Sequence, residues 1–223
     1  MQFIKSSDWH PAIAVLQKRL TDELSAGKKV LWLVSGGSNV KASVTVMQAL
    51  AEVLTANLTI LLADERYGAV SHPNSNAQQL LASGFNPQRA RLLSVLQDNT
   101  SFSATRDNYD RIARSAFTDN EIVIGQFGIG PDGHIAGILP NSEAVTSPEF
   151  VAAYSQQPYQ RLTLTPHALK RVSAAYALVF GDDKRPALEL LASKLVPYAE
   201  QPSQILKELP EAYVFNDQIG ETL

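Results

Sequence analysis

Residues 121–140 read E-I-V-I-G-Q-F-G-I-G-P-D-G-H-I-A-G-I-L-P, and the chain is organised around this stretch. Its first part is an apolar run with β-branched side chains, which is typical of a strand buried on both faces of a parallel sheet. The second part holds the residues that bend a chain and stop a long helix: Gly128, Gly130, Gly133, Pro131 and Pro140. The stretch therefore predicts a buried strand that ends in a tight loop.

Two titratable side chains, Asp132 and His134, lie in this loop. Open α/β sheets bind their ligands at the carboxyl ends of the strands, so we interpret both residues as candidate catalytic groups. Each also has a structural interpretation. His134 can simply bond to the backbone of its loop, and aspartate is common in glycine-rich turns for reasons of turn geometry.

The segment from Gly128 to Gly133 also fits the pattern G-x-G-x-x-G, which many dinucleotide-binding proteins carry after a strand. In those proteins the pattern opens a long helix whose N-terminus holds the pyrophosphate. Here Gly137 and Pro140 interrupt the helical pattern almost at once. A nicotinamide cofactor is therefore not predicted.

Composition limits the class of protein. The chain has 223 residues, 45% of them hydrophobic, which predicts a single domain over residues 1–223 with a proper core. Its net charge of −3 without blocks of like charge argues against a nucleic-acid partner, and the absence of cysteine excludes a zinc finger. No apolar run is long enough for a membrane span and no leader pattern opens the chain, so we expect a cytoplasmic protein.

Hydrophobic periodicity predicts an alternation of strands and helices along the chain. The predicted strands cover residues 29–34, 58–63, 92–96, 121–128, 160–165, 173–180 and 212–215. The predicted helices cover residues 7–26, 40–55, 77–81 and 101–117, with a last helix ending near residue 195. This alternation predicts an α/β fold, with a doubly wound, mostly parallel sheet and helices on both faces.

Further polar groups follow other predicted strands. Ser35, Gly36, Gly37 and Ser38 form a strand-to-helix turn whose free N–H groups suit an anion, although a plain tight turn has the same composition. Asp64, Glu65 and Arg66 end the next strand. There an aspartate can orient water and an arginine can bind a phosphate. The structural alternative is a solvated ion pair, which is the role we expect for Glu65.

Two more cations occur near strand ends in the second half of the chain. Lys184 is expected at the N-terminus of a helix, where a lysine is unfavourable for the helix dipole unless an anion is bound nearby. Arg161 begins the predicted strand at residues 160–165, where a surface position would explain it equally well. Because strands of one parallel sheet end at the same edge, we expect these groups to converge on one site.

Taken together, these motifs resemble the 6-phosphogluconolactonase family in order and spacing over nearly the whole chain. The motifs are S-G-G-S at residues 35–38, D-E-R at 64–66 with H-P-N-S-N at 72–76, G-I-G-P-D-G-H at 128–134, R-L-T-L-T at 161–165 and G-D-D-K at 181–184. The wider group includes the glucosamine-6-phosphate deaminases. Those enzymes carry a catalytic glutamate where this chain has Leu139, which favours the lactonases.

The chain departs from the family pattern at two positions. Where the lactonases usually continue S-G-G-S with Thr-Pro, this chain has Asn39 and Val40, so one hydroxyl ligand and a turn-setting proline are missing. In the leucine-phenylalanine-proline of the family, Ile138 and Leu139 replace the first two residues and Pro140 is kept. The detail of the phosphate cradle is therefore open.

The resemblance implies hydrolysis of 6-phosphoglucono-δ-lactone, a small phosphosugar lactone, without a metal or cofactor. The residues suit that chemistry, with His134 as general base and either Asp132 or Asp64 to orient the histidine or the water. Loop N–H groups of Gly130 and Gly133 are expected to meet the oxyanion. The phosphate ligands implied are Arg66, Arg161, Lys184 and the turn Ser35, Gly36, Gly37 and Ser38.

Two alternatives stay open from the residues alone. One is glucosamine-6-phosphate deamination and isomerisation, with Asp64 abstracting a proton. The other is a non-catalytic sugar-phosphate sensor, which would normally carry a helix-turn-helix segment that the sequence does not show. The sequence does not decide the oligomeric state, closure of the loops, the range of lactones accepted, or which acid supports His134.

Overall fold

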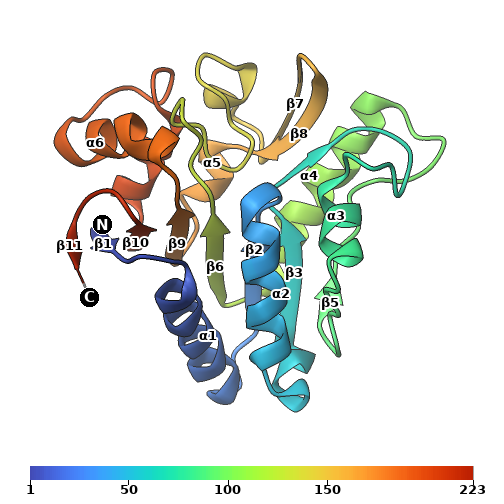
Figure 1. The fold of residues 1–223 in the computed structure, drawn as a ribbon. Helices are drawn as coiled ribbons and strands as arrows, with labels where there is room; N and C mark the ends of the chain where they lie inside the picture. The colour runs from blue at the N-terminus through green and yellow to red at the C-terminus, as the bar shows by residue number, and fades with distance from the viewer. Residues whose placement is uncertain (223) are drawn as a thin grey trace.

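Eight parallel strands form the main sheet of the computed structural model, which describes residues 1–222 (Figure 1). In spatial order they are β11 (Glu221–Thr222), β1 (Gln2–Lys5), β10 (Glu211–Asn216), β9 (Ala174–Val179), β6 (Ile122–Phe127), β2 (Val30–Val34), β3 (Leu58–Leu62) and β5 (Arg91–Leu92). All their pairings are parallel. Their carboxyl ends therefore lie at one edge of the sheet; in Figure 1 the arrows of β9 and β6 point toward this edge, at the top.

The central strands are buried on both faces, which explains the helices on either side. Along β2, Leu31 and Leu33 belong to one apolar core, whereas Trp32 and its neighbours Val30 and Val34 belong to the other. Successive side chains of a strand point to opposite faces, so a continuous apolar run needs cover on both. The predicted doubly wound α/β fold is confirmed.

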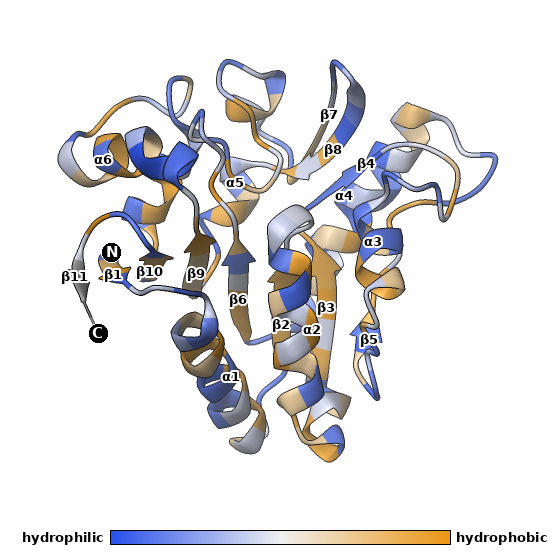
Figure 2. Cartoon of the chain, viewed as in Figure 1, coloured by the Kyte–Doolittle hydropathy of each residue, from blue (hydrophilic) through white to orange (hydrophobic). Residues whose placement is uncertain are grey.

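The helices divide between the two faces. One core receives α1 (His10–Ser25), α2 (Val40–Ala49) and α3 (Asn76–Ala82); the other receives α4 (Phe102–Asp119), α5 (Pro166–Leu169) and α6 (Arg185–Ser193). Short 3₁₀ turns are η1 (Gly37–Asn39), η2 (Glu52–Asn57), η3 (Glu143–Val145), η4 (Asp182–Lys184) and η5 (Pro202–Glu208). Figure 2 shows β3 in hydrophobic colours and α1 and α2 in mixed colours, as one-sided burial requires. Among the described helices, none combines the length and apolar character needed to cross a membrane.

A second, three-stranded antiparallel sheet stands above the main one. It consists of β4 (Asp64–Arg66), β8 (Tyr159–Leu164) and β7 (Val151–Gln156), with β8 in the middle. The chain passes from β3 into β4 at Ala63, whose carbonyl accepts the N–H of Leu164. The sequence predicts β8 but neither β7 nor β4. The three charged residues of β4 show no hydrophobic alternation, and the strand is held by backbone pairing with β8.

Several predicted boundaries differ from those observed. The first helix begins at His10, and neither Ser7 nor Asp8 caps it; instead the Asp8 carboxylate accepts the N–H of His10 at 2.8 Å. The helix predicted over residues 40–55 ends at Ala49 because Leu50 is extended, and the separate turn η2 follows. The strand β1 and the edge strand β11 are too short to give a sequence signal. Ser75 is the N-cap of α3 and Ser101 the N-cap of α4, each accepting a backbone N–H with its side chain.

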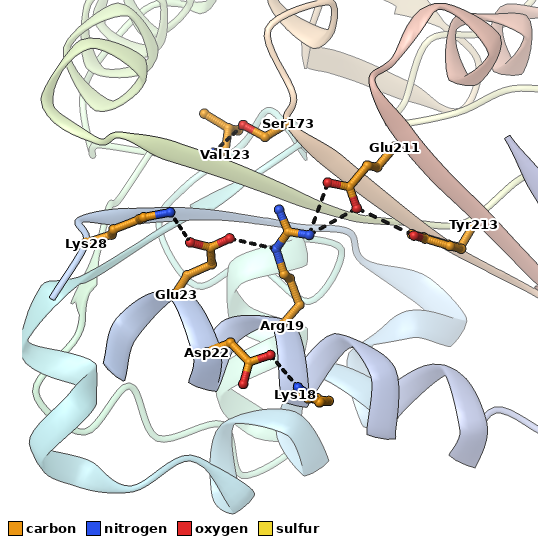
Figure 3. Close-up of polar contacts among 9 residues, drawn as sticks. All are labelled: Lys18, Arg19, Asp22, Glu23, Lys28, Val123, Ser173, Glu211 and Tyr213. Carbon is orange, nitrogen blue, oxygen red and sulfur yellow. Dashed lines mark hydrogen bonds and ion pairs between the residues drawn. The ribbon is translucent and has the colours of Figure 1, made fainter. Parts of the chain in front are cut away.

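An ion-pair network fastens α1 beneath the sheet (Figure 3). The Arg19 guanidinium lies between two carboxylates, with Nε 2.9 Å from Glu23 and Nη1 3.0 Å from Glu211 at the start of β10. Lys28 supports Glu23 at 2.7 Å. The Arg19 side chain is only 25% exposed, so its loss leaves the Glu211 carboxylate without this partner in a partly desolvated place.

We expect Arg19→Met to lower the free energy of unfolding by about 1–2 kcal/mol, since it breaks a partly buried network. The matched control is Lys18→Met, which removes the exposed pair of Lys18 and Asp22 on the same helix and should cause no measurable change. Urea denaturation of both variants measures the difference. Equal losses would show that the network does not fasten α1.

Candidate active site

A cavity of about 260 Å³ opens at the carboxyl edge of the main sheet, where the second sheet stands over it. It collects residues that are far apart in the sequence. The predicted site residues that line it are Ser35, Gly36, Gly37, Ser38, Asp64, Arg66, Gly130, His134, Arg161 and Lys184. Two predicted residues, Asp132 and Gly133, lie outside the lining.

The turn between β2 and α2 forms one wall. Its residues Gly37–Asn39 make the 3₁₀ turn η1, and Gly37 has a φ of +64°, a conformation that favours glycine. Gly36 has another constraint, because a Cβ there would lie 2.2 Å from Asn76 Oδ1. Neither η1 nor α2 has a side-chain cap, so no side chain covers the N–H groups at this helix start.

Two arginines face each other across the second sheet. Arg66 on β4 is paired in register with Arg161 on β8, and both line the cavity. Within residues 1–222 neither forms an ion pair; Arg66 Nη1 donates to the carbonyl of Asn74 at 3.1 Å. Two guanidinium groups without a carboxylate partner make a strongly positive wall, which suits an anionic ligand.

Lys184 supplies a third cation from the opposite side. It ends η4 and is the N-cap residue of α6, as the sequence predicts. Its side chain is 22% exposed, and Nζ lies 2.8 Å from an oxygen of Asp183. Lys184 therefore lines the cavity while its ammonium group is paired with the neighbouring carboxylate.

His134 and Asp132 form a close pair in the loop after β6. Asp132 Oδ1 lies 2.6 Å from His134 Nδ1 and also accepts the His134 backbone N–H at 3.1 Å. Burial opposes ionisation of Asp132, but the hydrogen bonds and charge of His134 outweigh it, so the pKa of Asp132 is lowered. An ionised carboxylate can only accept, so Nδ1 carries the proton and Nε2 of the neutral ring is the basic nitrogen.

Asp64 lies deeper in the cavity wall. It is only 7% exposed, and a Cβ on Gly137 would lie 2.6 Å from its side chain, so the loop passes directly over it. Burial raises the pKa of the Asp64 carboxyl, while the positive charges of Arg66, Arg161 and His134 oppose part of that rise. Of the two acids, Asp132 is thus the one bonded to His134.

The N–H groups of Gly130 and Gly133, which are predicted to meet the oxyanion, already have partners in this geometry. The N–H of Gly130 donates to the carbonyl of His134 at 3.0 Å, and the N–H of Gly133 donates to the carbonyl of Gly130 at 2.9 Å. Both of these N–H groups are therefore used within the tight turn. Glycine is required at both positions by packing, since a Cβ on Gly130 would meet the His134 ring at 2.1 Å and one on Gly133 would meet Gln201 at 2.5 Å.

Five buried polar atoms around the cavity lack a hydrogen-bond partner within the described residues. They are Ser35 Oγ, Asn39 Oδ1, Asn76 Oδ1, Arg66 Nε and Arg161 Nε. Buried polar groups are normally satisfied, and all five residues line the cavity. Donors and acceptors are both present, which fits a ligand with both hydroxyl groups and anionic oxygens.

Three polar residues at or near the cavity were not predicted as site residues, although Asn39 and Asn76 lie in or next to the quoted motifs. Asn39 replaces a hydroxyl residue of the family, and its backbone carbonyl accepts from Gln126 Nε2 at 3.2 Å. Gln126 is fully buried on β6. Asn76 donates from Nδ2 to the Asp64 carbonyl at 3.0 Å. A glutamine inside an apolar strand was the one available signal, because buried polar residues need partners.

Glu65 does not form the expected ion pair. It is fully buried, and its carboxylate accepts the backbone N–H groups of Arg66 and Asn76, each at 2.7 Å, and of Ala77 at 3.0 Å, with the Ser75 hydroxyl at 2.9 Å. Burial raises the pKa of Glu65 and these hydrogen bonds oppose the rise. Glu65 therefore ties β4, which carries Asp64 and Arg66, to the first turn of α3.

Comparison with known proteins decides the family. Residues 9–218 match the family described as glucosamine-6-phosphate isomerases/6-phosphogluconolactonase. The chain belongs to this family. Its match extends over all the strands and helices that line the cavity.

Relatives within the family carry the lactonase name. The chain is 23% identical to 6-phosphogluconolactonase of Synechocystis sp. over 95% of this chain and 92% of the relative. It is 26% identical to 6-phosphogluconolactonase of Helicobacter pylori over 92% of this chain and 91% of the relative. The crystal structure of 6-phosphogluconolactonase from Thermotoga maritima has a TM-score of 0.80 at 19% identity, covering 96% of this chain and 97% of that one, and so shares the fold.

The family position that separates its two activities lies in the core. Leu139 is 9% exposed, sits in the larger apolar cluster and donates its N–H to the Tyr154 hydroxyl at 3.3 Å. No carboxylate enters the cavity from this position. Within residues 1–222 no group of three or more His, Cys, Asp or Glu side chains is arranged to hold a metal ion.

Glu65→Gln should lower the free energy of unfolding by about 1–3 kcal/mol, because one amide NH₂ then faces backbone N–H donors and leaves a buried donor unsatisfied. We expect Asp64 and Arg66 to move when the side chain at residue 65 loses its bonds, so ligand affinity should fall too. Thermal or urea denaturation measures the change in the free energy of unfolding.

Ser75→Ala is the control, since it removes the cap of α3 and the hydroxyl bond to Glu65 but leaves the three backbone bonds from Arg66, Asn76 and Ala77 to that carboxylate. It should lose stability without losing ligand affinity. A Glu65→Gln protein that is as stable as the wild type would contradict the assignment.

Proposed function

We propose that this chain is a 6-phosphogluconolactonase, which hydrolyses the ring ester of 6-phosphoglucono-δ-lactone to 6-phosphogluconate in the oxidative pentose phosphate pathway. One observation carries the proposal: a histidine oriented by an ionised aspartate shares its cavity with three cations. A base beside an anion site is the arrangement that hydrolysis of a phosphorylated ester needs. We further propose that the reaction takes place in the cytoplasm.

The proposed reaction uses Nε2 of His134 as general base. Nε2 takes a proton from a water molecule as the water oxygen forms a bond to the lactone carbonyl carbon. The tetrahedral intermediate then collapses, the bond between that carbon and the ring oxygen breaks, and His134 returns the proton to the departing ring oxygen. The sum is addition of one water, which leaves a free acid and a hydroxyl group.

Asp132 and Asp64 have separate roles in this scheme. Asp132 holds the Nδ1–H of His134 and stabilises the imidazolium that forms. Asp64 is left to orient the attacking water or a substrate hydroxyl, because it lines the cavity and does not bond to the ring. The oxyanion donor is not Gly130 or Gly133, whose N–H groups bond within the loop.

The phosphate of the substrate is proposed to bind to Arg66, Arg161, Lys184 and the turn Ser35, Gly36, Gly37 and Ser38. These contacts lie away from the reacting carbonyl, so they supply binding energy that positions the ester beside His134. A small phosphosugar lactone is therefore the proposed partner, and neither nucleic acid nor membrane is proposed as one.

Glucosamine-6-phosphate deamination is the second activity named in the family, and the site favours it less. Its distinguishing glutamate is replaced by the buried Leu139. A non-catalytic sensor is disfavoured too, because such a protein has no need for the bonded pair of Asp132 and His134. Glucosamine 6-phosphate belongs in every assay as a parallel substrate.

His134→Ala should lower kcat/KM on fresh 6-phosphoglucono-δ-lactone by roughly 10²-fold to 10⁴-fold, because the general base is lost. The spontaneous hydrolysis of the lactone is subtracted from both rates. His10→Ala is the control, since His10 is an exposed residue on α1 outside the cavity. Activity that survives in His134→Ala would remove His134 from the mechanism. Turnover of the amino sugar alone would replace the lactonase proposal.

Asp132→Asn should lower kcat/KM roughly tenfold or more, by a similar factor at every pH between about 5 and 8. The pKa of Asp132 is lowered from 3.8, so the contribution of its carboxylate is present above that value and is lost only as the pH falls through the still lower pKa of the folded protein. Profiles of rate against pH for both proteins test this. A defect that disappears toward pH 5 would contradict it.

A further inference from the structure

Tyr159, the first residue of β8, lies against both arginines of the cavity wall. Its ring centroid is 4.9 Å from Cζ of Arg66 and 5.5 Å from Cζ of Arg161. Both distances are within the range of a cation–π contact. Tyr159 itself does not line the cavity, and it lies two residues before Arg161 on β8, on the same face of the strand and beside the two guanidinium groups.

The positive charges of Arg66 and Arg161 repel each other, and the Tyr159 ring contacts both of them. Like charges directly opposite each other on paired strands repel, and Arg66 and Arg161 occupy such paired positions. Neither has an ion-pair partner among residues 1–222, and Asp64 is the acid whose pKa responds to both. Apart from the bond of Arg66 Nη1 to the Asn74 carbonyl, no side-chain hydrogen bond among residues 1–222 fixes the two guanidinium groups.

The Tyr159 ring contacts the two guanidinium groups with its aromatic face and not with its hydroxyl group. Within residues 1–222 no hydrogen bond involves the Tyr159 hydroxyl, whereas other tyrosines near the site use theirs, such as Tyr154 to the Gly137 carbonyl at 2.5 Å. The negative potential of an aromatic face attracts a guanidinium group and also restricts its plane. One ring thus serves as a common surface for two cations.

We propose that Tyr159 is a positioning residue that holds Arg66 and Arg161 together as a preformed binding site for the phosphate dianion of the substrate. This inference rests on the proposed function, in which both arginines bind that phosphate. A preformed pair of cations loses less side-chain freedom when the anion arrives, so the ring contributes to affinity without touching the ligand. Ground state and transition state both carry the phosphate, and the contribution is therefore to KM.

The test compares Tyr159→Leu with Tyr159→Phe. Leucine keeps an apolar side chain but removes the aromatic face, so KM for the lactone should rise roughly tenfold with kcat nearly unchanged, since two cation–π contacts are lost. Phenylalanine keeps the face and loses only the hydroxyl, so Tyr159→Phe should behave as the wild type. A KM that stays unchanged in Tyr159→Leu overturns the proposal, as does an equal rise in Tyr159→Phe.

Tyr67→Leu is the control for loss of an aromatic residue in the same region. The Tyr67 ring packs on Phe102 at 5.1 Å, and its hydroxyl donates to the Thr100 carbonyl at 2.7 Å. This variant should lower the melting temperature without raising KM. A rise in KM as large as that in Tyr159→Leu would show that general loosening of the second sheet is responsible, and would overturn the specific role of Tyr159.

A binding measurement separates this inference from the proposed activity. Titration calorimetry with 6-phosphogluconate should give a Kd that rises roughly tenfold in Tyr159→Leu and is unchanged in Tyr159→Phe. If the wild type binds 6-phosphogluconate in this pattern but does not hydrolyse the lactone, the positioning role stands and the lactonase proposal fails. If the lactone is hydrolysed but both Tyr159 variants bind like the wild type, the positioning role fails alone.

Discussion

The parallel alignment of eight strands is the constraint on which the site depends. Because every pairing in the main sheet is parallel, the loops that follow β2, β3, β6 and β9 leave from one edge. The polar residues of four separate sequence motifs meet there without any motif being long. The ion pairs of Arg19 at the opposite end of the sheet help to hold α1 and β10 in place, far from the chemistry.

The second sheet converts this edge into an enclosed cavity. It pairs β4 with β8 and so brings Arg66 opposite Arg161, which are 95 positions apart in the chain. Two like charges in such positions are unfavourable without compensation. The aromatic ring beside them and the anion proposed to bind them supply that compensation.

Buried polar groups connect the parts of the site. The Glu65 carboxylate joins β4 to α3, and Asn76 at the start of α3 bonds to the Asp64 carbonyl. Asn76 also occupies the space that a side chain on Gly36 would need. Movement of any one of these groups therefore disturbs the acid, the arginine and the anion-binding turn together. A site of this kind is rigid because its members share hydrogen bonds.

The sequence by itself determined the alternation of strands and helices, the doubly wound α/β class and most of the cavity lining, from Ser35 to Lys184. Those features follow from local rules, since apolar periodicity and glycine-rich turns act over a few residues. The short strands β1, β4 and β11 were not predictable, because backbone pairing with distant segments creates them; β7 was not predicted either, although it pairs with the next strand along the chain. The tertiary structure alone decided that Asp132, and not Asp64, supports His134, that the N–H groups of Gly130 and Gly133 are occupied within their turn, and that Glu65 caps a helix without a cation. Each of these depends on which hydrogen-bond partner is nearest in space, and spacing along the chain does not contain that information.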